Sequence, residues 1–110
     1  MLSIDLSKKI FSNGILEGHT SVVNSVGFNH DGTKIVSGSD DRTIRVWNVD
    51  TGECILTLKG HTDVVMSVGF NHDGTKIVSG SFDKTIRVYK TELFPPLKDH
   101  AQILFDEILK

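Results

Sequence analysis

Residues 16–47 read LEGHTSVVNSVGFNHDGTKIVSGSDDRTIRVW, and residues 58–89 read LKGHTDVVMSVGFNHDGTKIVSGSFDKTIRVY. The second stretch repeats the first without a gap, and 26 of the 32 aligned positions are identical. A period of about 40 to 45 residues indicates a repeat architecture, in which one unit of supersecondary structure recurs along the chain. The fold of the 110-residue chain therefore depends on what one unit forms.

One unit has the pattern of a series of short strands. Runs of β-branched and aromatic residues alternate with turn residues, and the pair Asp31-Gly32 is typical of a hairpin turn. Helical periodicity is absent from the unit. The predicted strands of the first unit are residues 22–28, 35–38, 43–47 and 54–58.

The apolar residues of these strands point to both faces of the predicted sheet. By strict alternation, Val22, Val26 and Phe28 share one face of the first strand, and Val23 takes the opposite face. A sheet that is apolar on both faces has to be covered on both sides. Stacking of repeat units against one another satisfies this requirement.

Three short motifs recur in each unit and carry a family resemblance. They are Gly18-His19, Ser37-Gly38-Ser39 and the closing Trp47 in the first unit, and their counterparts in the second unit. On these motifs, residues 16–89 resemble the WD-repeat β-propeller family. The resemblance implies an all-β fold of two four-stranded propeller blades, and a non-catalytic scaffold or adaptor that mediates protein–protein interaction.

The resemblance also implies a buried hydrogen-bonded tetrad in each unit. An Asp orients a neutral imidazole, which bonds a hydroxyl that in turn bonds an aromatic N–H, so that four buried polar groups satisfy one another. Because a phenol directs its polar atom along the ring axis, the tetrad that ends in Tyr89 is predicted to be the weaker one. The implied structural tetrads are His19, Ser37, Asp41 and Trp47, then His61, Ser79, Asp83 and Tyr89.

The positions at which the two units differ indicate a binding surface. Asn24 and Asp40 of the first unit are replaced by Met66 and Phe82 in the second. Methionine and aromatic residues are enriched at protein interfaces, although drift of exposed loops explains the same differences. The partner-binding top face that the resemblance implies consists of Val22, Asn24, Asp40, Val64, Met66 and Phe82.

No catalytic site, cofactor site or metal site is predicted. His, Ser and Asp recur together as they do in hydrolases, but Ser37 stands in mid-strand without the strained elbow that a nucleophilic serine needs. Neighbouring His30 and Asp31 lie in a turn, for which turn chemistry is the simpler explanation. The glycines form no phosphate-binding loop.

The charge, the hydropathy and the cysteine content exclude some classes of partner and indicate the cellular compartment. With 12 Lys+Arg against 14 Asp+Glu, the chain lacks the positive charge that nucleic-acid or anionic-membrane binding requires. No segment is as long and apolar as a membrane span, and the charged N-terminus is unlike a signal peptide. The one cysteine, Cys54, cannot form an intramolecular disulfide. A location in the cytosol or nucleus is predicted.

The predicted organisation leaves the second unit without an outer strand of its own. Pro95-Pro96 stands where that strand should begin, and proline removes the donors of a sheet ladder. Apolar residues from Ala101 to Leu109 recur at helical spacing and predict a short C-terminal α-helix. The predicted divisions are 1–15 with an outer-strand donor, 16–57 and 58–92 as the two repeats, and 93–110 as linker and helical tail.

Two blades are too few to close a propeller, which has about four to eight. One hypothesis is a homo-oligomer by strand exchange, in which about three or four chains complete a ring. The other is that the sequence is a fragment of a longer or degraded gene. The alternative to the scaffold function is a structural self-assembling blade unit, or a truncated fragment of a larger WD-repeat protein, with no independent binding function. The partner proteins of the scaffold are not identified by the sequence.

Overall fold

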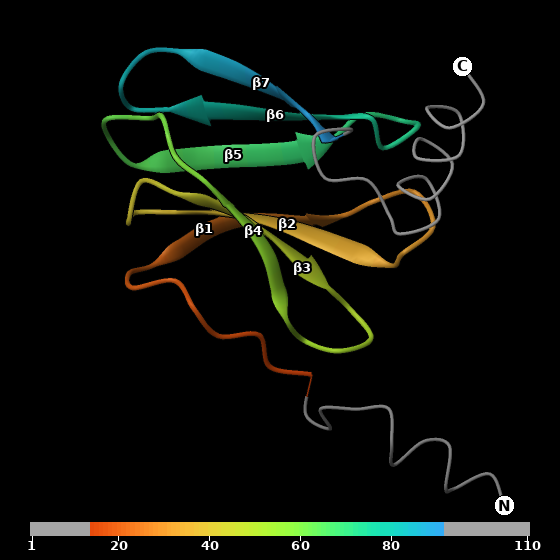
Figure 1. Ribbon diagram of the computed structural model, residues 1–110. Coiled ribbons are helices and arrows are strands. Elements are labelled where there is room, and N and C mark those ends of the chain that lie inside the picture. Colours follow the sequence, from red (N-terminus) through yellow and green to blue (C-terminus); the bar gives the residue numbers. More distant parts are fainter. Residues whose placement is uncertain (1–13, 92–110) are drawn as a thin grey trace, which may run out of the picture.

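The computed structural model describes residues 14–91, which form two antiparallel sheets and no α-helix (Figure 1). The first sheet consists of β1 (Val23–Phe28), β2 (Lys34–Ser39), β3 (Ile44–Asn48) and β4 (Cys54–Leu58), in sequence order. The second consists of β5 (Val65–Phe70), β6 (Lys76–Ser81) and β7 (Ile86–Lys90). The all-β prediction is confirmed. The predicted N-terminal donor strand, apart from its last residues, and the predicted C-terminal helix lie outside the described residues.

The hairpin turns follow from local side-chain chemistry. In the turn between β1 and β2, Gly32 has a φ of 75°, in the left-handed region that glycine adopts without strain. The carboxylate of Asp31 accepts hydrogen bonds from the backbone N–H and the hydroxyl of Thr33, at 3.0 and 2.6 Å. Asp73 and Thr75 make the same contacts in the second unit. These turns set the register of both hairpins.

A β-bulge interrupts the first strand of each unit. Val23 pairs with Ser39 and Ser25 pairs with Gly38, so that Asn24 is the extra residue of β1. Met66 is the extra residue at the same place in β5. A bulge changes the faces on which the following side chains lie.

The bulge corrects one expectation about the faces of β1. Val23 lines a single surface pocket together with Val26 and Phe28, so these three side chains share a face. The prediction that Val23 lies opposite Val26 is wrong, because strict alternation leaves no room for the extra residue at Asn24. Val22 precedes the strand.

The two sheets stack face to face as two layers, and β5 lies against β1 and β2 (Figure 1). The core lies between the layers, with partly buried Leu56, Leu58, Val68, Phe70 and Tyr89 packed around it. Burial of such aliphatic side chains contributes about 1.5 to 3 kcal/mol each. The fully buried core residues are Val36, Ile44 and Val46 of the first sheet, and Val65 and Ile77 of the second.

Gly38 is the point of closest approach between the sheets. A Cβ atom at this position would lie 2.7 Å from Cγ1 of Val65 and 2.8 Å from Cγ1 of Val68. Both distances are shorter than van der Waals contact, so no larger residue fits here without a shift of the second sheet. The glycine of the Ser37-Gly38-Ser39 motif is therefore a packing requirement.

Candidate functional site

In the first unit, four polar side chains from separate parts of the chain form one hydrogen-bonded series. His19 precedes β1, Ser37 lies on β2, Asp41 follows β2 and Trp47 lies on β3. Nδ1 of His19 lies 2.9 Å from a carboxylate oxygen of Asp41, and Nε2 lies 2.6 Å from Oγ of Ser37. The indole N–H of Trp47 donates to the same Oγ at 2.8 Å. Ser37 and Trp47 are 3% and 2% exposed.

These contacts determine the direction of each hydrogen bond. Since the carboxylate of Asp41 only accepts, Nδ1–H of His19 is the donor, and in a neutral imidazole Nε2 is then the acceptor. The hydroxyl of Ser37 donates to Nε2 and accepts from Trp47. Every polar atom of the series is thereby satisfied, and the series holds the segment before β1 against the strands.

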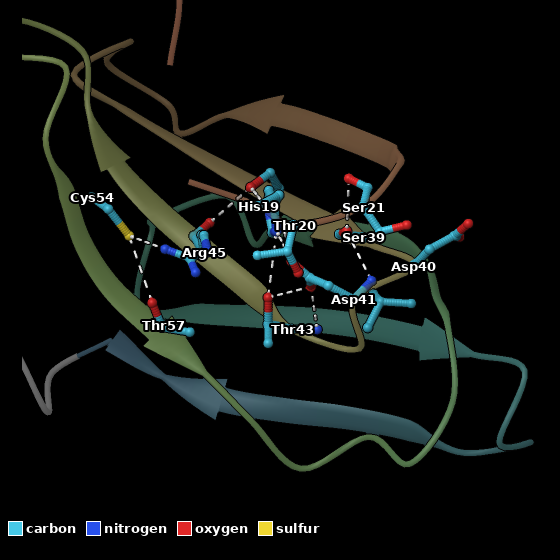
Figure 2. A network of polar contacts seen from close by, with 12 residues as sticks. His19, Thr20, Ser21, Ser39, Asp40, Asp41, Thr43, Arg45, Cys54 and Thr57 are labelled. Carbon is cyan, nitrogen blue, oxygen red and sulfur yellow. Dashed lines mark hydrogen bonds and ion pairs between the residues drawn. The ribbon is translucent and has the colours of Figure 1, made fainter. Parts of the chain in front are cut away.

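Asp41 also binds residues that the sequence analysis did not single out. Its carboxylate accepts from the backbone N–H of Thr20 at 3.0 Å, and from the backbone N–H of Thr43 at 2.9 Å together with the Thr43 hydroxyl (Figure 2). Burial raises the pKa of Asp41, but the hydrogen bonds from Thr43, His19 and Thr20 outweigh it and hold the pKa well below its ordinary value of 3.8. The carboxylate is therefore the anionic centre of the turn between β2 and β3.

The depressed pKa makes stability dependent on acid pH. A carboxylate whose pKa is lowered by folding stabilises fully above its unfolded pKa, and this contribution is lost as the pH falls toward the folded pKa. Thr43→Val removes a hydroxyl donor to Asp41 and is expected to lower stability at neutral pH and to reduce the loss on acidification. Thermal unfolding followed by circular dichroism from about pH 7 to about pH 2 measures both effects.

Thr51→Val is the matched control for this experiment. Thr51 lies in the turn between β3 and β4 and contacts Glu53 rather than the Asp41 carboxylate. The control is expected to follow the acid profile of the unmodified chain. A Thr43→Val profile that runs parallel to the unmodified one at all pH values would contradict the assignment.

The second unit repeats the series up to its last member. His61 contacts Asp83 at 2.8 Å through Nδ1 and Ser79 at 2.8 Å through Nε2. The hydroxyl of Tyr89 is buried and has no hydrogen-bond partner among residues 14–91. Burial raises the pKa of Tyr89, which keeps the phenol neutral. Ser79 thus lacks the aromatic donor that Ser37 receives from Trp47.

Asp83 keeps the same environment as Asp41. Hydrogen bonding by the Thr85 hydroxyl is the main reason that the pKa of Asp83 lies well below its ordinary value, and His61 and the backbone of Thr62 add to it. Thr43 and Thr85 are the residues that sequence reasoning missed in both units. The signal was available, since an Asp followed two residues later by Thr matches the side-chain contacts seen in the hairpin turns.

The face predicted to bind partners divides into a polar half and an apolar half. In the first unit, the amide of Asn24 donates to the carboxylate of Asp40 at 2.7 Å and to the backbone carbonyl of Val65 at 2.9 Å. Asn24 therefore links the two sheets and has a structural role in addition to any at the surface. Val22 beside it is 61% exposed.

The apolar half belongs to the second unit. Met66 and Phe82 are 39% and 62% exposed, while Val64 is half-buried. The backbone N–H of Phe82 donates to the carbonyl of Val64 at 3.0 Å, which fixes the turn that presents the ring. Asn24 and Asp40 touch each other, so their counterparts Met66 and Phe82 occupy neighbouring positions.

The described residues offer little for catalysis or metal binding. Ser37 and Ser79 are 3% and 1% exposed, which withholds both hydroxyls from a substrate. Within residues 14–91 no group of three or more His, Cys, Asp and Glu side chains is arranged to hold a metal ion. His30 and His72 lie side by side at the exposed turns, with ring centroids 5.0 Å apart. No helix in this part of the chain is long and apolar enough to cross a membrane.

Comparison with known proteins matches both units to one family. The pattern of the family described as WD domain, G-beta repeat, fits residues 11–48 and 52–90. Together these ranges contain all seven strands and both hydrogen-bonded series.

Individual relatives match over a shorter length. Proteins named ribosome biogenesis protein BOP1 homolog from Drosophila grimshawi and Drosophila ananassae are 48% identical over 44 residues, and the one from Drosophila melanogaster is 46% identical over the same length. The match covers 40% of this chain and 6% of each relative. The chain thus spans a small fraction of the length of the curated relatives it matches.

Proposed function

The chain belongs to the WD40 repeat family, and we propose that it is a non-catalytic scaffold that binds another protein through the face carrying Met66 and Phe82. In this proposal each sheet is one propeller blade, and the blades act within an oligomeric or longer propeller. The buried hydrogen bonds of His19 to Ser37 and of His61 to Ser79 give the blades rigidity, because they join the segments before β1 and β5 to the strands. A rigid surface binds a partner at a low entropic cost.

The observation that carries the proposal is the contrast between two nearly identical units. The differences Arg42/Lys84 and Trp47/Tyr89 are conservative. Met66 and Phe82, in contrast, are two exposed apolar side chains that replace the hydrogen-bonded pair of Asn24 and Asp40. Exposure of a large aromatic side chain and a neighbouring methionine favours a protein interface over a solvated surface. The partner that best fits these two side chains is a protein with an apolar pocket.

The test is a double substitution, Met66→Ala with Phe82→Ala. The variant is expected to lose the proteins that the unmodified chain retains on affinity capture, at a cost of about ten-fold or more in affinity, because few interface residues carry most of the binding energy. Ile55→Ala is the matched control, since Ile55 is 40% exposed and lies on β4, outside this face. An unchanged set of captured proteins with the double variant would refute the assignment of this face.

A second candidate function is purely structural. The chain would then be a self-assembling blade unit or a fragment of a larger WD40 protein, without a binding partner of its own. The wide apolar area that the two sheets leave exposed on their outer faces favours this candidate. The double variant separates the two functions, because an assembly unit does not depend on Met66 and Phe82 to retain a foreign protein.

The relatives indicate which structural unit is shared, and the cysteine content indicates the cellular compartment. The ribosome biogenesis proteins share about one repeat length of 44 residues with this chain, which supports a common blade rather than a common pathway. Cys54 is free, as in proteins of reducing compartments. We place the chain in the cytosol or the nucleus.

A further inference from the structure

The outer face of the first sheet is apolar and open. Val23 is 46% exposed, and Val26 and Phe28 are each 64% exposed. Around them is a surface pocket that also includes Leu16, Ile35 and Trp47. A monomeric protein that leaves so many adjoining apolar side chains in water is unusual, and such a patch marks an interaction surface.

The outer face of the second sheet is open as well. Val78, Ile86 and Val88 are 45%, 75% and 61% exposed. A shallow pocket on this face is lined by Ser67 and Gly80 together with Val78 and Ile86. In the part of the chain that the structure describes, no atom lies within 4 Å of a Cβ built at Gly80.

The interface between the two sheets of one chain is formed by residues equivalent to those on the two open faces. Val65, Val68 and Phe70 are the second-unit counterparts of Val23, Val26 and Phe28, and they carry the same side chains. Their partners in the core include Val36, Ile44 and Val46, which are the first-unit counterparts of Val78, Ile86 and Val88. The open face of the first sheet therefore carries the same apolar residues as the second sheet's side of the internal interface. The open face of the second sheet carries the same apolar residues as the first sheet's side.

Two contacts show how closely the faces fit. Val65 and Val68 pack over Gly38, where a Cβ atom would lie within 2.8 Å of both side chains. The backbone N–H of Val68 donates to Oγ of Ser25 on the opposite sheet, at 3.2 Å. On the open face of the second sheet, Gly80 and Ser67 occupy the places of Gly38 and Ser25.

We propose that a second copy of this chain packs the outer face of its first sheet onto the outer face of the second sheet. Val23 and Val26 of one copy lie over Gly80 of the other, and the Val26 N–H donates to Oγ of Ser67. The proposal deepens the blade assembly put forward above and rests on it. A second copy is the occupant, because it carries the residues already seen to fill this interface.

The contact is head to tail, so every copy uses both of its faces. Such an interface adds copies until a ring closes or a filament forms. One bond of the internal interface is missing from the new one, since Met66 replaces Asn24, whose amide donates to the carbonyl of Val65. The contact between copies is therefore weaker than the contact between the two sheets of one chain.

Gly80→Ala tests the proposal without disturbing the chain itself. The added Cβ meets nothing among residues 14–91 of its own chain, but it would meet Val23 and Val26 of the second copy as a Cβ at Gly38 meets Val65 and Val68. The association constant from sedimentation equilibrium is expected to fall by about ten-fold or more, since overpacking of a close interface is costly. Circular dichroism checks that the β-sheet content is retained.

Gly27→Ala is the matched control. Gly27 also lies on a strand. Among residues 14–91 nothing lies within 4 Å of a Cβ added there or at its counterpart Gly69, although Gly69 belongs to β5, the strand that packs against the first sheet. This variant is expected to associate as the unmodified chain does. Equal association of the Gly80→Ala variant and the unmodified chain would overturn the proposal, as would equal weakening by Gly27→Ala.

A gain of affinity provides the complementary measurement. Met66→Asn with Phe82→Asp restores in the second unit the pair that links the sheets in the first, and it is expected to tighten self-association about three-fold or more, the value of one net hydrogen bond. If self-association tightens and the captured foreign protein is lost, both proposals are supported. If self-association tightens and the foreign protein is still captured, only the proposed function is contradicted. Unchanged or weaker self-association contradicts the packing of copies.

Discussion

Replacing Ser37 with alanine is expected to lower the free energy of unfolding by about 3 kcal/mol, because it leaves two buried polar groups without a partner. The hydroxyl is the acceptor for the indole N–H of Trp47 and the donor to Nε2 of His19. Ser37 is 3% exposed, so water does not take its place without rearrangement. Urea unfolding followed by circular dichroism measures the loss.

Ser79→Ala is the matched control in the second unit. Its hydroxyl bonds Nε2 of His61 at 2.8 Å, while the Tyr89 hydroxyl finds no partner in the described part of the chain. The expected loss is about half of that for Ser37→Ala, since one group rather than two is orphaned. Equal losses for the two serines would contradict the account of Tyr89.

Gly38→Ala is expected to destabilise the stacked sheets by about 3 kcal/mol, at the upper end of the usual cost of overpacking. The added Cβ would lie 2.7 Å from Val65 and 2.8 Å from Val68, and both side chains are branched at Cβ and stiff. The sheets have to separate locally to admit it. The same urea unfolding experiment measures the change.

Gly69→Ala serves as the control, because Gly69 lies on β5 and an added Cβ there has no neighbour within 4 Å among the residues that the structure describes. Its stability is expected to stay within about 0.5 kcal/mol of the unmodified chain. If Gly38→Ala proved as mild as Gly69→Ala, Val65 and Val68 would not pack directly over Gly38.

Much of the fold follows from the sequence. The internal repeat and the turn residues predict strands whose ends lie within about one residue of those in the structure, and the all-β class is confirmed. The bulge at Asn24 was not predicted, because an inserted residue in a run of Val, Ser and Gly leaves no local mark in the sequence. It moves Val23 to the face of Val26, and with it the boundary of the apolar surface.

The residues of the polar site could be predicted from the sequence, but not all of their hydrogen-bond partners could. The resemblance names His19, Ser37 and Asp41, and the structure joins these side chains by hydrogen bonds. The bond from Asn24 to the carbonyl of Val65 was not predictable, because it depends on how the two sheets come together in space. Contacts between a side chain and a distant backbone atom carry no sequence pattern.

The central claim is that the two open faces of the chain are complementary and are closed by further copies. The mass of the unmodified chain in solution, from light scattering coupled to size exclusion with circular dichroism on the same peak, tests this claim most directly. We predict a β-rich assembly of at least two chains, with a mass that is a multiple of the 12.1 kDa of one chain. A folded, β-rich monomer of 12.1 kDa that persists as the concentration is raised would contradict the claim.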